Sequence, residues 1–143
     1  MSGLAALLAG HVPAGVLRWE GAYDPGEIRH VVEHAGWGFA HLDGWTVGGQ
    51  PREVLGALGE AMGFGDHFGR NLDALADSLR DLSRPTGTVL LWDGWTVLAR
   101  ADERYFRLVL QVLGERCADP VGPPFAALLR GEGPDLPGVA LLV

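Results

Sequence analysis

Two aspartates on one expected helix are the residues whose type and spacing could carry chemistry. Asp73 and Asp77 stand one helical turn apart in the stretch HFGRNLDALADSL, so their carboxylates share a helix face. Like charges at this spacing cost a helix about 0.2–0.5 kcal/mol. Paired carboxylates can act as a general acid and base, and His67 is close enough in sequence to move a proton between them. The same pair can instead attract a positively charged partner.

Residue chemistry leaves three interpretations of this pair open. A catalytic site needs the burial that separates the acid from the base, whereas both carboxylates are expected on the solvent side of the helix. A solvated face is also reasonable, because the helix macrodipole favours a negative charge at Asp73 in the first turn. Arg70 and Arg80 stand three positions before Asp73 and three after Asp77, where intrahelical ion pairs form. The third interpretation is a surface that binds a partner.

The segments around the pair predict how it is positioned. Asn71 precedes the helix, and its side-chain oxygen can cap the free N–H groups of the first turn. The preceding loop contains Gly63, Gly65 and Gly69, which suit positive φ or the close approach of another chain. Leucines at helical spacing form an apolar stripe on the opposite face, at Leu72, Leu75, Leu79 and Leu82.

Strands and helices alternate along the rest of the chain. Apolar runs predict strands at 15–20, 38–43, 88–92, 125–130 and 139–143. Amphipathic spacing predicts helices at 24–36, 51–62, 71–82 and 102–117. This order is typical of an α/β fold with a mainly parallel sheet and right-handed crossovers, and we expect one domain over residues 1–143. Residues 131–138 are too few for a crossover helix, so we expect the last strand to pair antiparallel with its predecessor or to add at an edge.

Composition limits the possible functions. The 143 residues carry a net charge of −7, which argues against a nucleic-acid binder and permits attraction to a basic protein. Hydrophobic residues make up 48% of the chain, as in a globular protein. Cys117 is the only cysteine, so no intramolecular disulfide forms and a reducing cytoplasm is the expected location. It falls on a predicted core face, where it should be inert.

Other classes of site lack support in the sequence. The opening MSGLAALLAG is short for a signal peptide and has no basic residue, so we expect a frayed or loosely packed terminus. No apolar run approaches the roughly 18–20 residues that span a membrane. His30 and His34 share a helix face but lack a third ligand, and phosphate-binding glycine motifs are absent. We therefore expect no metal, no cofactor and no membrane partner.

Residues 67–77, HFGRNLDALAD, resemble the signature of the barstar family of intracellular ribonuclease inhibitors. That signature is a pair of aromatics followed by Gly-x-Asn-Leu-Asp-Ala-Leu-x-Asp. VLQVLGE at 109–115 is similar to the family's last helix, and TVLLW at 88–92 to its central strand. The resemblance covers about 41–130 and implies a small parallel sheet of three strands with helices packed on it. Residues 1–40 and 131–143 lie outside this core, and we expect them to add strands and a helix at the margins of the sheet.

The resemblance also implies roles for single residues. Asp77 would be the central plug that meets the arginines and the catalytic histidine of a ribonuclease. Asp73 would pair with positive groups nearby, and Glu115 would add a contact from the neighbouring helix. Gly69 and Asn71 would shape the loop.

The chain departs from the family pattern at four positions. His67 stands where the family has tyrosine and would stack or hydrogen-bond there. Ala76 replaces a frequent tryptophan, and Leu82 replaces a contacting one. Arg80 stands where the best-known member has threonine, and its charge beside Asp77 would repel a strongly basic enzyme. These departures bear on which nuclease is bound.

The sequence therefore predicts a stoichiometric inhibitor of a basic, secreted microbial ribonuclease, with no turnover of its own. We expect it to be cytoplasmic and monomeric when free, and to contact neither nucleic acid nor membrane. The alternative is a barstar-like binding or regulatory module for a protein that is not a nuclease. A carboxylate-based hydrolase ranks third.

Overall fold

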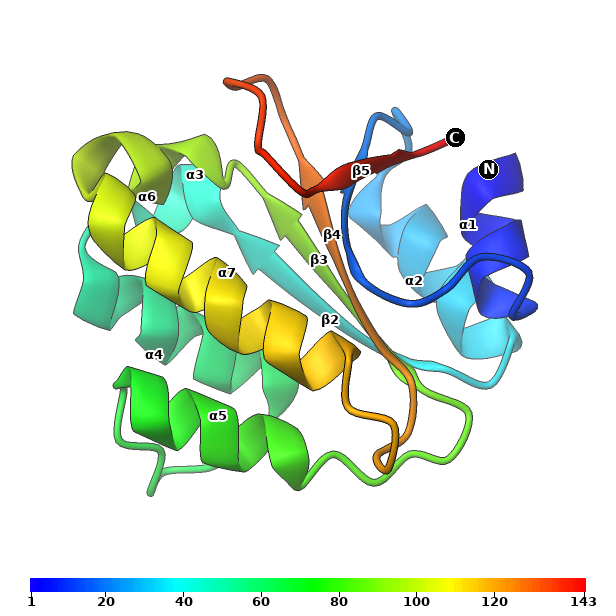
Figure 1. Ribbon diagram of the computed structural model, residues 1–143, viewed down its shortest axis with the longest axis horizontal. Coiled ribbons are helices and arrows are strands. Elements are labelled where there is room, and N and C mark those ends of the chain that lie inside the picture. Colours follow the sequence, from blue (N-terminus) through cyan, green and yellow to red (C-terminus); the bar gives the residue numbers. More distant parts are fainter.

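Parallel strands form one sheet through the middle of the protein, and helices cover both of its faces (Figure 1). The computed structural model describes residues 1–143. The strands are β1 (Val16–Trp19), β2 (Gly38–Asp43), β3 (Thr88–Asp93), β4 (Phe125–Arg130) and β5 (Ala140–Leu142). The helices are α1 (Ser2–Leu8), α2 (Pro25–His34), α3 (Gly44–Val47), α4 (Pro51–Met62), α5 (Leu72–Arg80), α6 (Thr96–Ala101) and α7 (Glu103–Cys117).

The order of strands in the sheet is β2-β3-β4-β1-β5, and every pairing is parallel. The prediction of an α/β fold with a mainly parallel sheet is confirmed. Strand β3 lies between β2 and β4 in full register, with Leu90 paired to Ala40 and to Ala127. Its continuous apolar sequence follows from this position, because a strand inside a parallel sheet is covered on both faces.

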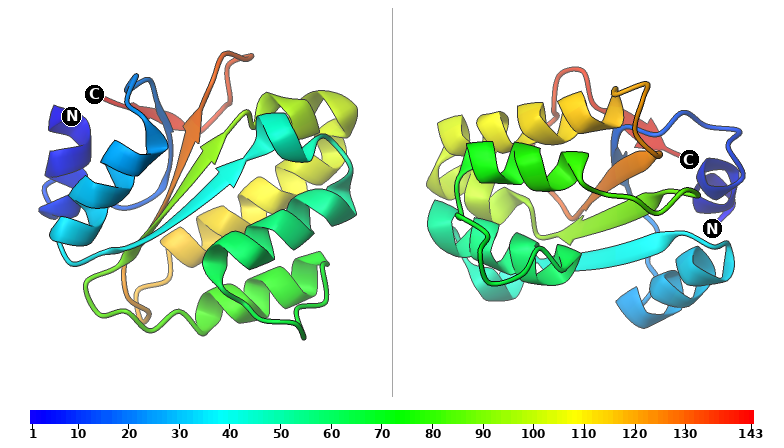
Figure 2. Two further views of the ribbon diagram at one scale, coloured as in Figure 1. Left: turned by 180° about the vertical axis from the view of Figure 1, so that it is seen from behind. Right: turned by 90° about the horizontal axis from the view of Figure 1, so that it is seen from below.

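The sheet separates two hydrophobic cores. Figure 2 shows, from behind and from below, the helices that cover the two faces of the sheet. The larger core contains 17 buried residues and lies between the sheet and α4, α5, α6 and α7. The smaller contains 12 and lies under α1 and α2. Alternate residues of each strand point to opposite cores, so that Trp92 enters the larger one and Leu91 the smaller one.

The last strand, β5, does not pair antiparallel with its predecessor, which was one of the two arrangements we expected. β5 is an edge strand, as the other alternative expected. It is parallel to β1, with Leu17 beside Ala140 and Trp19 beside Leu142, and it does not pair with β4. The antiparallel expectation is wrong because β1 lies between the two strands, so no tight hairpin joins them. Arg18 on β1 holds the connecting segment by donating hydrogen bonds to the carbonyls of Gly131 and Pro134.

Residues 2–8 form helix α1 where we expected a frayed or loosely packed terminus, and that expectation is wrong. Leu4 and Leu7 lie on one face of the helix and are fully buried in the smaller core. A side chain at Gly3 would collide with the backbone of Val143, so α1 packs closely on the end of β5. Its partner surface comes from the other end of the chain, which local sequence does not reveal. The short helices α3 and α6 were also not predicted. None of the helices is both long and apolar enough to cross a membrane.

Candidate functional site

The loop between α4 and α5 is shaped by glycines and held against α4. Gly63 ends α4 with φ of +73°, and Gly65 has φ of +84°, which are left-handed values that glycine adopts without strain. A side chain at Gly59 would collide with the ring of Phe68, and one at Gly56 would lie 3.1 Å from the Arg70 guanidinium. The loop therefore rests on two glycines one turn apart in α4. We did not single them out in the sequence, although glycines at this spacing inside a helix are a recognisable sign of close packing.

Asn71 joins this loop to α5 through both ends of its amide. Its Oδ1 accepts from the N–H of Ala74 at 2.8 Å, and its Nδ2 donates to the carbonyl of Gly69 at 3.3 Å. The cap predicted from the sequence is confirmed. Gly69 does not have positive φ; a Cβ there would lie 3.1 Å from the Asn71 amide and 3.3 Å from Ala74, so the close approach of these groups favours glycine.

Helix α5 buries its leucines and exposes its carboxylates. Leu75 and Leu79 are fully buried, as the apolar stripe predicted. Asp73 is exposed in the first turn and forms no side-chain hydrogen bond or ion pair. Asp77 forms an ion pair with Arg80 one turn later, although both side chains remain about two-thirds exposed, at 68% and 63%. An exposed pair of this kind contributes about 0–1 kcal/mol.

Helix α7 brings Glu115 beside α5. Glu115 is exposed and accepts a hydrogen bond from Gln111 at 3.1 Å. A hollow of about 160 Å³ between the two helices is lined by Ala76, Arg80 and Glu115, among others. Arg80 and Glu115 thus border one depression.

Arg116 fixes the spacing of these two helices. It is buried at 5% exposure, and its Nε donates to the carbonyl of Leu79 at the end of α5 at 2.9 Å. Its Nη2 donates to Pro123 at 2.8 Å, and the guanidinium lies over the Phe125 ring. Because α5, α7 and the approach to β4 share this one side chain, the residues on the outer surface of both helices are held in fixed relative positions.

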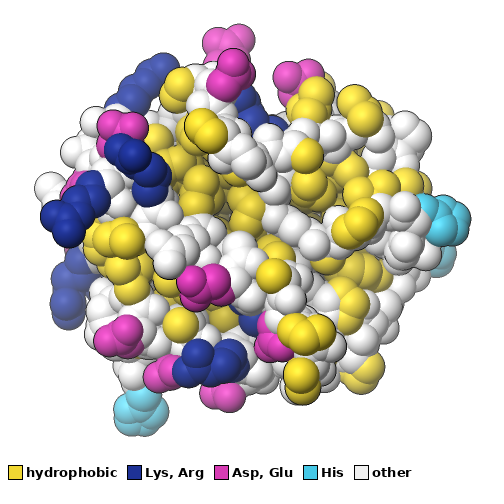
Figure 3. Space-filling model, in the orientation of Figure 1, with side chains coloured by type: hydrophobic (Ala, Val, Ile, Leu, Met, Phe, Trp, Pro, Cys, Tyr) yellow, Lys and Arg dark blue, Asp and Glu magenta, His cyan; other side chains and the backbone are white.

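The structure brings some of the predicted residues together and leaves one apart. Asp77, Arg80 and Glu115 belong to the shared face of α5 and α7, and Asp73 lies one turn before Asp77 on the same side. Figure 3 shows acidic side chains over α5 and the later part of α7, with arginine among them. His67 lies exposed in the loop and makes no hydrogen bond to either aspartate.

A buried ionic cluster that we did not predict lies at the carboxyl ends of β2, β3 and β4. Asp93 accepts from Arg130 through both oxygens, at 2.6 and 2.9 Å, and from His41 at 2.9 Å. Burial by itself would raise the pKa of Asp93, but the hydrogen bonds and charges of Arg130 and His41 outweigh it and lower the pKa. Arg130 also donates to the carbonyls of Gly21 and Tyr23, at 2.8 and 2.6 Å. We call this group the Asp93 cluster; it ties β3 and β4 to the segment that follows β1.

Cys117 packs against the larger core, as the sequence predicted. Burial raises its pKa to about 12, so the thiolate is negligible at neutral pH. His30 and His34 stack on α2 with ring centroids 6.0 Å apart, and no third His, Cys, Asp or Glu joins them to form a metal-binding group.

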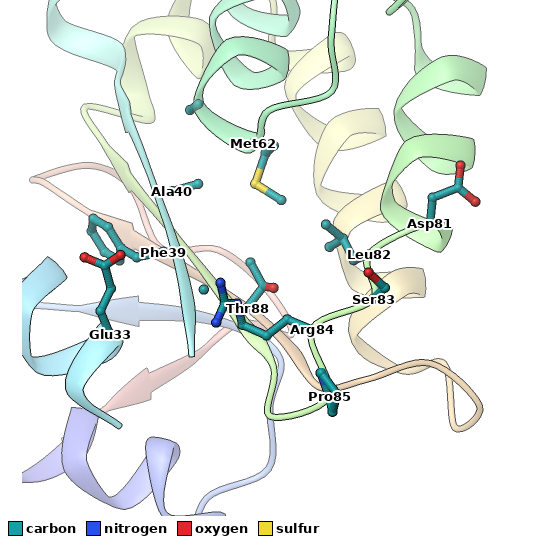
Figure 4. A pocket seen from close by; sticks show the side chains of 12 residues that line it. Glu33, Phe39, Ala40, Met62, Asp81, Leu82, Ser83, Arg84, Pro85 and Thr88 are labelled. Atoms are coloured by element: carbon teal, nitrogen blue, oxygen red, sulfur yellow. The ribbon is translucent and has the colours of Figure 1, made fainter. Parts of the chain in front are cut away.

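A pocket of about 580 Å³ lies at the edge of β2, away from the acidic face (Figure 4). Its lining comes from β2, the end of α4 and the segment after α5, with Met62 and Leu82 on its apolar side and Arg84 crossing towards β2. None of the residues predicted to bind a partner lines it. The acidic face of α5 and α7 is therefore the candidate site, and it is a surface rather than a deep cavity.

The fold and the acidic face of α5 and α7 define the class of protein. The protein is a small α/β domain in which an ordered glycine loop, α5 and α7 present exposed acidic side chains on one rigid surface. Comparison with protein families then identifies it: the model described as Barstar (barnase inhibitor) matches residues 37–130, which is more than half of the chain. The chain belongs to the barstar family. A comparison with curated proteins found no match.

The matched range corresponds to part of the fold. It runs from just before β2 to the end of β4 and so contains the three strands β2, β3 and β4 with α3 to α7. The additional elements are α1, β1, α2 and β5. Of these, β1 pairs with β4 and β5 pairs with β1, so both extend the family sheet on the same side. The addition brings two helices, where the sequence led us to expect one.

Proposed function

We propose that the protein is a stoichiometric, intracellular inhibitor of a basic ribonuclease, and that the α5–α7 face covers the active site of that enzyme. The observation that carries this proposal is the position of Asp77 and Asp73, exposed on a capped helix within the family-matched segment, with Glu115 beside them on α7. Carboxylates held at fixed spacing can take the place of substrate phosphates in front of cationic side chains. The net charge of −7 adds long-range attraction to a basic enzyme.

We propose distinct roles for the residues of this face. Asp77, which pairs with Arg80 at the border of the α5–α7 hollow, is proposed as the central contact, with Asp73 one turn earlier on α5 and Glu115 on α7 as further contacts. Gly69 and Asn71 shape the loop, and His67 offers an exposed ring for stacking or hydrogen bonding.

The test is binding to, and inhibition of, a panel of small basic microbial ribonucleases, by calorimetry and by RNA cleavage. Asp77→Ala should weaken capture of the inhibited enzyme by at least about 2 kcal/mol, the scale of an interface hot spot, which complexes of this family helped to define. Asp24→Ala, which removes an exposed carboxylate far from the face, is the matched control and should change affinity little. If Asp77→Ala inhibited the enzyme as tightly as the unmodified protein, the proposed role of Asp77 would be wrong.

One observation favours a second candidate, a binding module for a protein that is not a nuclease. Arg80 pairs with Asp77 and lies beside Glu115, so the centre of the face carries both signs of charge. Such a surface also suits a partner that presents an acidic group opposite Arg80. The two candidates differ in their response to salt: capture of a strongly basic nuclease weakens steeply as ionic strength rises, and capture of a partner of mixed charge weakens less.

A further inference from the structure

A second large cavity lies outside the acidic face, between α7 and the segment that leads into β5. Its volume is about 730 Å³, within the range of roughly 300–1,000 Å³ that small-molecule sites occupy. Figure 3 shows apolar atoms on the floor of a hollow at this place. Trp95, Phe106 and Leu110 form the apolar wall on the helix side, and Leu136 faces them from the segment. No residue proposed to contact a nuclease lines this cavity.

The far wall of the cavity comes from residues outside the family-matched range. Residues 134–137 form it, and they are held in place by Arg18 of β1, which donates to the carbonyls of Pro134 and Gly131 at 3.2 and 3.4 Å. The cavity is therefore a product of the added strands β1 and β5 together with α6 and α7. It belongs to the extended form of the fold.

Charge pairing around the rim leaves one cation unpaired. Glu103 pairs with Arg107 at 3.1 Å, and Asp135 lies 4.0 Å from Arg18. Arg100 also lines the cavity, and it forms neither an ion pair nor a side-chain hydrogen bond. An anionic group on a bound molecule would complete this set of pairs.

Trp95 lies directly behind the lining of this cavity and is fully buried. Its indole N–H is buried and has no acceptor, whereas the indole N–H of Trp37 donates to the carbonyl of Leu8 at 3.2 Å. The Trp95 ring is otherwise well packed, stacked on Phe106 at 5.4 Å and covered by the Arg18 guanidinium at 5.2 Å. The Trp95 indole is therefore close to the cavity without being exposed in it.

We propose that this cavity binds a small amphipathic anion, an apolar body carrying one carboxylate or equivalent acid group. The apolar body packs against Ala99, Leu110 and Leu136, which line the cavity and are partly exposed, and the acid group pairs with Arg100. The site is independent of nuclease inhibition, because the two surfaces share no residue.

The test uses two dyes that share an aromatic body and differ in charge, 1-anilinonaphthalene-8-sulfonate and the neutral N-phenyl-1-naphthylamine. The folded protein should bind the sulfonate, and decanoate should displace it about tenfold better than decanol, the scale of one charge-assisted contact. Arg100→Ala should weaken the sulfonate about tenfold and leave the neutral dye unchanged. Arg104→Ala removes an exposed arginine that does not line the cavity, and it should change neither dye.

Nitrogen–proton NMR locates the binding. The Trp95 indole signal, identified by its loss in Trp95→Phe, should shift on addition of decanoate, while the indole signal of Trp37 stays in place. The proposal is overturned if Arg100→Ala binds the sulfonate as tightly as the unmodified protein. It is also overturned if decanoate leaves the Trp95 signal unmoved, because any dye would then be bound elsewhere.

Discussion

Replacing Arg130 with methionine tests whether the Asp93 cluster holds the added N-terminal segment onto the family core. The change keeps most of the side-chain length and removes the guanidinium that pairs with both oxygens of Asp93, at 2.6 and 2.9 Å. His41 would be the only remaining partner of that carboxylate. Breaking a buried pair by removing one member costs about 3–5 kcal/mol. The side chains of Arg130 and Asp93 are only 16% and 12% exposed, so little solvent screening applies, and we expect a loss near the lower end, about 3 kcal/mol.

The pH dependence of this loss has a definite sign. In the unmodified protein the folded pKa of Asp93 is lowered, so its stabilising effect is present above the unfolded value of about 3.9 and is lost as pH falls through the folded value. In Arg130→Met the guanidinium no longer offsets burial, and the charged carboxylate is disfavoured. The deficit should therefore be largest near pH 7.5 and should shrink at pH 4.5, where protonation of Asp93 becomes easier.

Urea unfolding followed by tryptophan fluorescence and by circular dichroism measures both effects. Arg107→Met is the control, since it removes an arginine from an exposed pair with Glu103, and it should cost less than about 1 kcal/mol. Adding Asp93→Asn to Arg130→Met removes the unpaired buried charge and should restore part of the lost stability at pH 7.5. A loss below about 1 kcal/mol in Arg130→Met, or no recovery in the double variant, would refute this account of the cluster.

Two further predictions concern the loop and the acidic face. Gly59→Ala forces the Phe68 ring out of place, so it should lower the free energy of unfolding by about 1–3 kcal/mol and weaken nuclease capture. Gly114→Ala is the control, because a Cβ at this position of α7 meets open space. It should raise the free energy of unfolding by roughly 0.5–1 kcal/mol in the same assay. Arg80→Ala releases Asp77 from its ion pair, so calorimetry should show binding to a basic nuclease that is stronger by up to about fivefold. The free energy of unfolding should change by less than about 1 kcal/mol, because the pair is exposed. Weaker binding of the nuclease would instead favour the partner of mixed charge.

Local sequence patterns predicted the elements of the candidate site well. The cap at Asn71, the buried leucines of α5 and the exposed positions of Asp73 and Asp77 all follow from helical periodicity and from capping chemistry, which act within a few residues. The strand bounds of β2 and β4 agree with the apolar runs for the same reason. Whether these residues contact a nuclease stays a prediction.

Features that depend on distant segments could not be predicted. Asp93 and Arg130 meet only because β3 and β4 are neighbours in register, and nothing within either strand reveals the pair. β5 pairs with β1 across almost the whole chain, and Leu4 and Leu7 of α1 are buried in a core that includes residues as distant as Leu142. The glycine contacts of α4 are an intermediate case, since the spacing is visible in the sequence and its partner is not.

The position of β1 within the sheet also determines the order in which the chain can complete its fold. β1 is made early, yet its neighbours are β4 and β5, and the bond from Arg18 to Gly131 joins residues 113 positions apart. On the ribosome the N-terminal segment therefore emerges without a strand to pair with, and it must wait until nearly all of the chain has been synthesised. Long-range pairing of this kind slows folding. The family-matched core, whose strands β2, β3 and β4 follow one another in the chain, can assemble before β1 and β5 are added to it.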